Sequence, residues 1–496
     1  MREPFGISMV TSNSNGASKV GTDRIPVSPT GGSAVERGWA VAGTRRGRAV
    51  VVAAAAGFTL VAQGTPAHPQ AGPAPAAPPV LQPAASTGAD ALPSTAGLQA
   101  ALGQLTQDKA LGTLTYAIAD GSTGKLLLGS GEGTPATPAS TTKLATSVAA
   151  LSLLPADTRI TTKVVQGATP ADIVLVGGGD PTLTGLPQDQ IRIGGLPVDS
   201  ETAPASLIDL AKQTATALKA AGTGTVHLSY DTSLYTGAAA HKNNDGTNIG
   251  PMSALMSDEG RNNPADDVEG PVRVPDPAAQ AAGRFADLLG AQGVKVDGKP
   301  KEGPAPAGAA ALGRVQSPTL PRLVERLLTH SDNTLAEAVG RQVALAAHQP
   351  ASYEGAGAAV SQTVGQLGIP LPGVSLNDAS GLNPHNAIPP LVLADLLALA
   401  AAPDHPQLRP VLTGLPIAGL TGTLDKRFTA AQGSADGAGV VRAKTGTLSG
   451  VNTLAGTVVD ADGRLLVFAL MTKGGTGDTR AAVDRIVAKL VSCGCH

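Results

Sequence analysis

Three short polar strings along the chain combine residue types that can cleave an amide bond through a covalent intermediate. They are Ser140–Lys143 (S-T-T-K), Ser331–Asn333 (S-D-N) and Lys444–Gly446 (K-T-G), in that order. A serine hydroxyl is a weak nucleophile and needs an adjacent base, which a lysine can supply when a dry site keeps it neutral. A second serine can carry the proton to the leaving group, and a second lysine can bind a carboxylate. Together the strings could supply an activated nucleophile, a proton relay and an anion-binding group.

The sequence around each string predicts a backbone that can present it. Apolar residues recur at helical spacing over 142–154, so Ser140 and Lys143 are expected on one face at the start of a helix. The S-D-N string interrupts a helical pattern over 320–347, and Ser and Asp favour the start of a new helix. The K-T-G string ends a strand predicted over 440–444, whose edge could pair with an extended peptide.

A single match to any of these strings means little. Ser122–Lys125 is a second S-x-x-K, but its place in a hairpin turn predicts exposed side chains, and Ser375–Asn377 repeats the S-x-N spacing. Each string alone also has an ordinary structural explanation, as a helix cap, a surface lysine or a glycine turn. Their order and contexts together favour catalysis.

The elements that would position these strings come from both ends of the chain. Turn residues predict a hairpin over 113–120 and 125–129, and successive strands are predicted over 440–444, 451–459 and 465–471. A helix is predicted over 479–491. One antiparallel sheet flanked by helices is the simplest arrangement, which places the protein in the α/β (α+β) class.

The spacing of the strings predicts an insertion. The chain between Lys143 and Ser331 is much longer than the chain between Asn333 and Lys444. We therefore expect a large inserted domain over 158–313, between two parts of the catalytic domain. Those parts are predicted to span 94–157 and 314–492.

On these residues the chain resembles the low-molecular-mass class C penicillin-binding proteins, the D-alanyl-D-alanine carboxypeptidase/endopeptidases. The resemblance runs from about residue 95 to the C-terminus. It includes further boxes at 174–183, at 251–255 with Asp258 and Arg261, at 377–382, and at 415–424 before Arg427 and Phe428. It implies a serine DD-peptidase/β-lactamase-like fold and an acyl-enzyme reaction on peptidoglycan stem peptides, with β-lactam antibiotics as covalent inhibitors. It implies no cofactor and no metal.

The resemblance also implies roles for six residues of the three strings and for Thr447. Ser140 would be the acylated nucleophile, Lys143 its base, and Ser331 the proton relay to the leaving D-alanine. Asn333 would hold the substrate amide. The substrate's terminal carboxylate would be bound by three residues, Lys444, Thr445 and Thr447. The backbone N–H groups of Ser140 and Thr447 would form the oxyanion hole.

Asp180 is a further candidate for substrate binding. It follows a strand predicted over 173–176 and a run of glycines, so we expect it at a domain edge. There its carboxylate could bind the free ammonium of a diaminopimelate in the stem peptide. The alternative is a turn-forming aspartate before Pro181.

Two other functions share these strings. A β-lactamase would need a group that activates water for fast deacylation, and no glutamate-centred loop stands at the expected place between Asn333 and Lys444. A non-catalytic cell-wall-binding protein of the same fold would not need intact catalytic residues. A zinc hydrolase and an α/β-hydrolase are disfavoured because H-E-x-x-H and G-x-S-x-G are absent from the sequence. The balance between carboxypeptidase and endopeptidase activity stays open.

Composition and the two ends indicate where the protein works. The net charge of -2 and an aromatic content of 2% disfavour nucleic acid as a partner. Within residues 1–63, arginines at 45, 46 and 48 precede the apolar stretch 49–62, which predicts export or a membrane tether. The Pro/Ala-rich stretch 64–93 predicts an extended linker. We therefore expect an exported protein at the cell wall. The only cysteines, Cys493 and Cys495, could form a labile bridge.

Overall fold

The computed structural model describes residues 92–267, 270–475 and 477–496. The tail and apolar segment predicted over 1–63, and the linker up to residue 91, lie outside these ranges. Among the described residues, no helix has both the length and the apolar character needed to cross a membrane.

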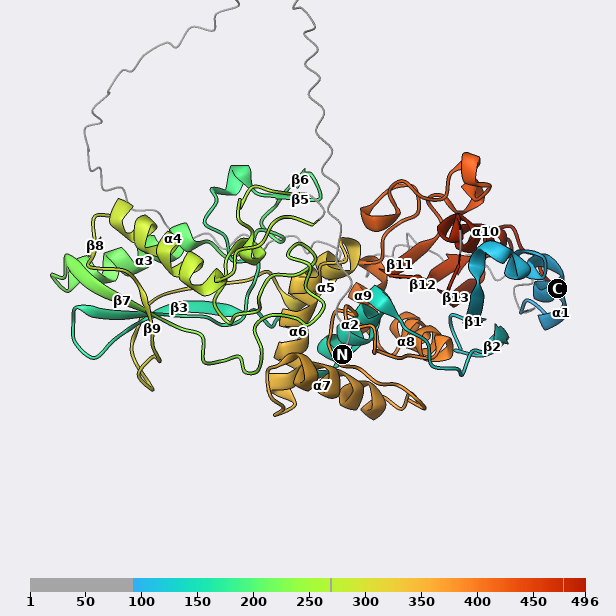
Figure 1. Ribbon diagram of the computed structural model, residues 1–496, viewed down its shortest axis with the longest axis horizontal. Helices are drawn as coiled ribbons and strands as arrows, with labels where there is room; N and C mark the ends of the chain where they lie inside the picture. Colours follow the sequence, from blue (N-terminus) through green and yellow to red (C-terminus); the bar gives the residue numbers. More distant parts are fainter. Residues whose placement is uncertain (1–91, 268–269, 476) are drawn as a thin grey trace, which may run out of the picture. The chain divides into compact units, whose positions relative to one another are not determined.

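A five-stranded antiparallel sheet joins the first and last parts of the described chain (Figure 1). Its strand order is β11-β12-β13-β1-β2, so the strand that carries K-T-G lies at one edge. The strands are β1 (Thr113–Asp120), β2 (Leu126–Ser130), β11 (Arg442–Leu448), β12 (Val451–Val459) and β13 (Leu465–Lys473). The prediction of one sheet built from both ends of the chain, covered by helices, is confirmed.

Side chains of the sheet alternate between two cores. Ala117 and Ala119 of β1 belong to the core beneath the central helices, whereas Ile118 between them belongs to the core beneath the C-terminal helix. This alternation follows from the two-residue period of a strand. The C-terminal helix α10 (Thr479–Val491) and the short α1 (Thr95–Leu102) cover the second face.

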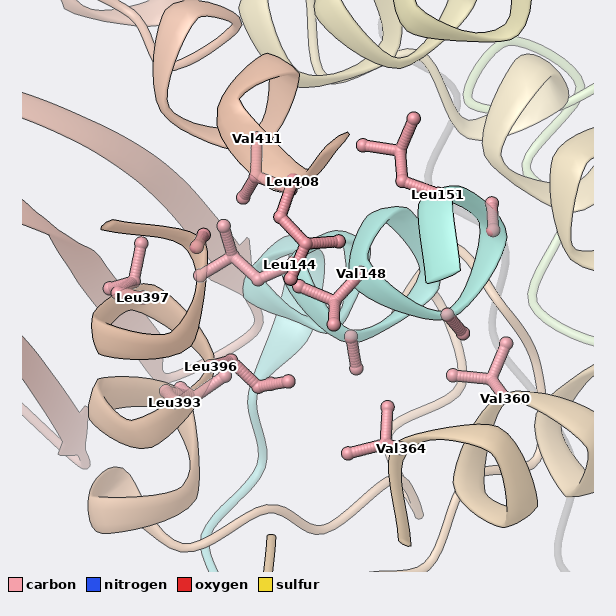
Figure 2. Close-up of a cluster of buried hydrophobic side chains, with 14 of the residues drawn as sticks. Leu144, Val148, Leu151, Val360, Val364, Leu393, Leu396, Leu397, Leu408 and Val411 are labelled. Atoms are coloured by element: carbon pink, nitrogen blue, oxygen red, sulfur yellow. The ribbon is translucent and has the colours of Figure 1, made fainter. Parts of the chain in front are cut away.

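Helix α2 (Thr142–Leu153) lies in the middle of the first core. Figure 2 shows Leu144, Val148 and Leu151 of this helix surrounded by aliphatic side chains of its neighbours. These neighbours are α5 (Leu320–Thr329), α6 (Asn333–Ala346), α7 (Tyr353–Gln366), α8 (Pro390–Ala401) and α9 (Arg409–Thr413). Because apolar side chains pack around it on several sides, α2 is a rigid support for the residues at its start.

A second sheet lies between α2 and α5 in the sequence, with a hydrophobic core of its own. Its strands are β3 (Thr161–Gln166), β4 (Asp172–Val176), β7 (Thr225–Asp231), β8 (Lys295–Val296), β9 (Lys301–Glu302) and β10 (Ala311–Gln316). Its helices are α3 (Leu207–Ala220) and α4 (Pro277–Ala291), and a small hairpin is formed by β5 (Arg192–Ile193) and β6 (Leu196–Pro197). We call this region, residues 161–316, the insert.

Two local details differ from or extend the sequence interpretation. Strand β11 does not end at Lys444 but continues to Leu448, because every residue of this stretch keeps its pairing with β12. At the C-terminus, Cys493 and Cys495 form a disulfide. The backbone carbonyl of Cys495 accepts a hydrogen bond from Ser94 N, which fixes the tail beside the start of α1.

Candidate active site

Ser140 and Lys143 meet at the start of α2. Ser140 is half-buried in a 3-10 turn, Ala139–Thr141, that leads directly into the helix. The Nζ atom of Lys143 lies 3.1 Å from Ser140 Oγ. The same Nζ donates to Asn333 Oδ1 at 2.6 Å and to the backbone carbonyl of Ser380 at 2.8 Å. The lysine therefore contacts the nucleophile of the first string and the asparagine of the second.

The environment of Lys143 shifts its pKa towards neutral pH. The side chain is fully buried, and this burial lowers the pKa of Lys143 to about 8. The negative charges of Asp378, Asp332 and Glu337 act in the opposite direction. A lysine with this pKa is partly unprotonated near neutral pH, so it can accept the proton of Ser140.

Ser331 and Lys444 form a second pair. Ser331 lies between α5 and α6 with a positive φ of 56°, and Asp332 caps α6 by accepting from Leu335 N at 2.9 Å. Lys444 is fully buried and donates from Nζ to Ser331 Oγ at 2.9 Å and to the Thr445 carbonyl at 2.8 Å. Burial, together with the positive charge of Lys143, lowers the pKa of Lys444 well below its usual value.

The β11 edge supplies backbone groups that face away from the sheet. Ala443 N donates to the Pro416 carbonyl, which lies outside the sheet. Successive N–H groups along a strand alternate in direction, so those of Thr445 and Thr447 point to the same outer side. Thr447 is exposed there, and the hydroxyl groups of Thr445 and Thr423 lie 2.8 Å apart.

Gly446 brings this edge against the nucleophile. A Cβ atom at this position would lie 2.7 Å from the Pro138 carbonyl and 3.0 Å from Ser140 N. It would also lie 2.1 Å from Thr453 Oγ1, a hydroxyl that donates to the same Pro138 carbonyl at 2.8 Å. Only glycine allows this close approach, which places β11 beside the turn that carries Ser140.

The six site residues of the three strings, together with Thr447, thus lie in one connected region. Lys143 joins Ser140 to Asn333, and Lys444 joins Ser331 to Thr445. Thr447 lies on the same β11 strand. The second S-x-x-K behaves differently, because Ser122 is exposed and donates its hydroxyl to Asp120 in a hairpin turn.

Asp180 does not occupy the exposed domain edge that the sequence suggested. Its side chain is only 1% exposed, and Oδ1 accepts from the backbone N and the hydroxyl of Thr182. Burial raises the pKa of Asp180 to about 6. These contacts are those of a buried turn, and the ammonium-binding role of Asp180 stays a prediction.

Sequence reasoning missed a group of buried polar residues behind Lys143. Glu337 Oε1 accepts from the backbone N atoms of Ala379 and Ser380, and Oε2 accepts from Arg341 at 3.1 Å. Asp378 accepts from four donors around the same turn, which include Gly381 N. The box at 377–382 was the only sequence signal for this group. It holds the Ser380 carbonyl on Lys143.

A half-buried serine paired with a buried lysine, a serine relay and an open strand edge on a helix-covered sheet define a serine acyl-transfer enzyme of the penicillin-interacting type. The sequence profile of the D-Ala-D-Ala carboxypeptidase 3 (S13) family matches residues 98–270 and 263–491. The chain belongs to this family.

Several known proteins are similar to the chain over most of its length. Carboxypeptidase Rv3627c of Mycobacterium tuberculosis is 37% identical over 414 residues, which cover 82% of this chain and 86% of that protein. Carboxypeptidase DacB of Mycolicibacterium smegmatis is 37% identical over 411 residues, which cover 81% and 85%.

Solved structures support the fold. Penicillin binding protein 4 of Haemophilus influenzae matches with a TM-score of 0.63 and 21% identity, over 78% of this chain and 98% of that one. The same protein complexed with a novel β-lactam matches with a TM-score of 0.58 and 23% identity, over the same shares of the two chains.

Proposed function

We propose that the protein is a serine D-alanyl-D-alanine carboxypeptidase that acts on peptidoglycan stem peptides through an acyl-enzyme. The observation that carries this proposal is the convergence of Ser140, Lys143 and Asn333 on one side of the site with Ser331 and Lys444 on the other. Family membership supports the same activity.

In the acylation step, Ser140 Oγ attacks the carbonyl carbon of the penultimate D-alanine and gives its proton to neutral Lys143. The negative charge that develops on the carbonyl oxygen is stabilised by the N–H groups of Ser140 and Thr447. Ser331 then passes a proton to the amide nitrogen as the C–N bond breaks, and D-alanine leaves. The Lys444–Ser331 hydrogen bond of 2.9 Å supports this role, because it orients the relay hydroxyl.

Substrate binding uses the same edge. An extended peptide that runs along β11 would accept and donate backbone hydrogen bonds as an added strand. Its terminal carboxylate would lie near Thr445, Thr447 and the positive charge of Lys444, while the Asn333 amide holds the peptide from the opposite side. Deacylation by water completes the cycle and returns the proton to the serine.

The β-lactamase alternative is not favoured by the residues present. Glu337 is a buried carboxylate near Lys143, but backbone N–H groups and Arg341 use both of its oxygens. Burial and the nearby charge of Asp378 raise its pKa. We therefore propose that a β-lactam acylates Ser140 and is released slowly, and that the protein is inhibited by penicillins. Cleavage of cross-links as an endopeptidase is a second activity that the open β11 edge would allow.

Export to the cell wall is part of the same proposal. The support is the sequence alone: a cluster of arginines at 45, 46 and 48 followed by the apolar stretch 49–62 and a Pro/Ala-rich linker. The substrate lies outside the cytoplasm, so the activity requires this location or a membrane tether through the same stretch.

The test combines covalent labelling with product analysis. A fluorescent penicillin should label the wild-type protein at Ser140, and Ser140→Ala should lose both the label and the release of D-alanine from purified muropeptides. Loss of a serine nucleophile costs on the order of 10⁶ in kcat. Ser122→Ala is the matched control and should be labelled normally. Label retained by Ser140→Ala would exclude the assignment, and rapid turnover of a chromogenic cephalosporin would favour the β-lactamase.

A further inference from the structure

One loop of the insert reaches the catalytic residues through two separate contacts. The loop spans residues 239–252 and is closed at its base, where Met252 N donates to the Ala239 carbonyl at 2.7 Å. Tyr353 on α7 donates its hydroxyl to the same carbonyl at 3.1 Å. We call this segment the insert loop.

The first contact is a buried histidine–aspartate pair. His241 is 6% exposed and its Nε2 lies 3.0 Å from Asp378 Oδ2. Its Nδ1 accepts the backbone N–H of Asn243 at 3.0 Å, so the ring proton is on Nε2 and is donated to Asp378. The ring also packs edge-on against Tyr353, with centroids 4.8 Å apart. Both the tautomer and the orientation of His241 are therefore fixed.

Asp378 transmits this contact to Lys143. Its Oδ1 accepts from Gly381 N at 2.9 Å, which shapes the turn that contains Ser380. The Ser380 carbonyl accepts a hydrogen bond from Lys143 Nζ at 2.8 Å. Among the negative charges that stabilise the Lys143 ammonium, that of Asp378 has the largest effect. His241 thus acts on the base through one intervening side chain and one turn.

The second contact fixes the asparagine of the S-D-N string. Asn333 Nδ2 donates to the backbone carbonyl of Asn248 at 2.9 Å, so its Oδ1 is turned towards Lys143. The Asn248 carbonyl is held in place by Asp245, whose Oδ1 accepts from Thr247 N at 2.9 Å and from Asn248 N at 2.8 Å. Asp245 is exposed and makes this turn without entering the protein core.

We propose that the insert loop is a positioning element for catalysis, in which His241 and the Asp245–Asn248 turn together fix two of the three partners of Lys143, the Ser380 carbonyl and Asn333. The inference rests on the proposed function. It assigns a catalytic purpose to a part of the insert whose sequence carries none of the three motif strings. It also explains why a neutral histidine is buried against an aspartate that already has three other donors.

Kinetics of two pairs of variants test the proposal. His241→Ala should lower kcat and the rate of penicillin acylation about 10- to 100-fold, because an error of about 1 Å in a catalytic group costs about 10²-fold. KM for the peptide should change much less. His241→Gln should recover part of the rate, since its Nε2 can still donate to Asp378.

A second pair of variants, at the exposed Asp245, keeps the test valid if His241→Ala does not fold. Asp245→Ala should slow acylation several-fold with an unchanged melting temperature, because only the turn that presents the Asn248 carbonyl is loosened. Asp245→Asn retains the acceptor oxygen and should behave as wild type.

His227→Ala is the matched control, because His227 forms an exposed pair with Asp172 in the same insert at 3.2 Å. It should be fully active. If wild type and His227→Ala both fail to be labelled, the proposed function is wrong. If both are labelled and Asp245→Ala acylates at the wild-type rate, the positioning role is overturned, whatever His241→Ala does to stability.

Discussion

Replacing Gly446 by alanine is the most direct test of how close the β11 edge must come to the nucleophile. The added Cβ would lie 2.1 Å from Thr453 Oγ1, 2.7 Å from the Pro138 carbonyl and 3.0 Å from Ser140 N. Ordinary van der Waals contact begins near 3.4 Å. The hydroxyl would have to move by more than 1 Å, and the two backbone atoms by several tenths of an ångström.

The expected loss of rate and stability in Gly446→Ala follows from the roles of the atoms that must move. Thr453 Oγ1 donates to the Pro138 carbonyl, so moving the hydroxyl disturbs the same turn that the Cβ already pushes. This turn holds both the nucleophile and one N–H of the proposed oxyanion hole. A displacement of about 1 Å costs about 10²-fold in rate. Overpacking a well-packed site costs about 1–3 kcal/mol of unfolding free energy.

The assay is the rate of acylation of Gly446→Ala by a fluorescent penicillin, together with chemical unfolding. Gly133→Ala is the control, because Gly133 is exposed and a Cβ atom added there would meet nothing within 4 Å. In the double variant Gly446→Ala/Thr453→Ala the shortest contact is gone, so part of the rate should return. A Gly446→Ala protein that acylates at the wild-type rate would refute the close approach of β11 to Ser140.

Four further predictions concern charges at and near the site. Acylation should rise with pH to a plateau above about 8, because only neutral Lys143 can take the proton; a flat profile from pH 6 to 9 argues against this base. Lys444→Ala should weaken the binding of a peptide with a terminal carboxylate about 10- to 150-fold more than the binding of the matching peptide amide, because a charge-assisted hydrogen bond contributes about that much. Equal losses for the two peptides would mean that Lys444 has a purely structural role. Asp180→Asn should leave the preference between diaminopimelyl and neutral peptides unchanged, and a selective loss on the former would restore the ammonium-binding role. Since burial raises the pKa of Asp180 to about 6, the folded state binds its proton more tightly, so wild-type stability should fall as pH rises from 4 to 6 and this fall should be reduced in Asp180→Asn.

The parts of the fold that were predictable are those with a short-range pattern. The turn residues between them predicted β12 and β13, and helical spacing predicted α2 and α10, because each of these signals is contained in the local sequence. The end of β11 was misplaced because glycine usually interrupts strands. Gly446 instead stays paired with Thr453, and its missing side chain makes room for the nucleophile turn.

The candidate site was predictable as a set of residues but not as a set of contacts. The three strings are local and carry their own signatures. The pairing of Lys143 with Asn333, and of Lys444 with Ser331, joins residues far apart in the sequence. No spacing rule relates them, since only the packing of α2, α6 and β11 brings them together.

The insert was still harder to interpret. His241 is one of eight histidines, and no periodicity or motif distinguishes it from His227, which lies on the surface. Asp180 shows the opposite error, because a glycine run before an aspartate suggested exposure while the structure buries the side chain. In both cases tertiary packing decides the environment, and local sequence does not report it.

The two lysines explain why the site should favour substrates with a carboxylate. Lys143 has the negative charges of Asp378, Asp332 and Glu337 around it, which partly offset the cost of burying an ammonium. Lys444 is equally buried, and the nearby charge that perturbs it most is the positive one of Lys143. A bound carboxylate beside Thr445 would supply the missing negative charge. It would hold Lys444 protonated and able to orient Ser331, while Lys143 stays free to act as the base, so one ligand charge would assign different tasks to the two lysines.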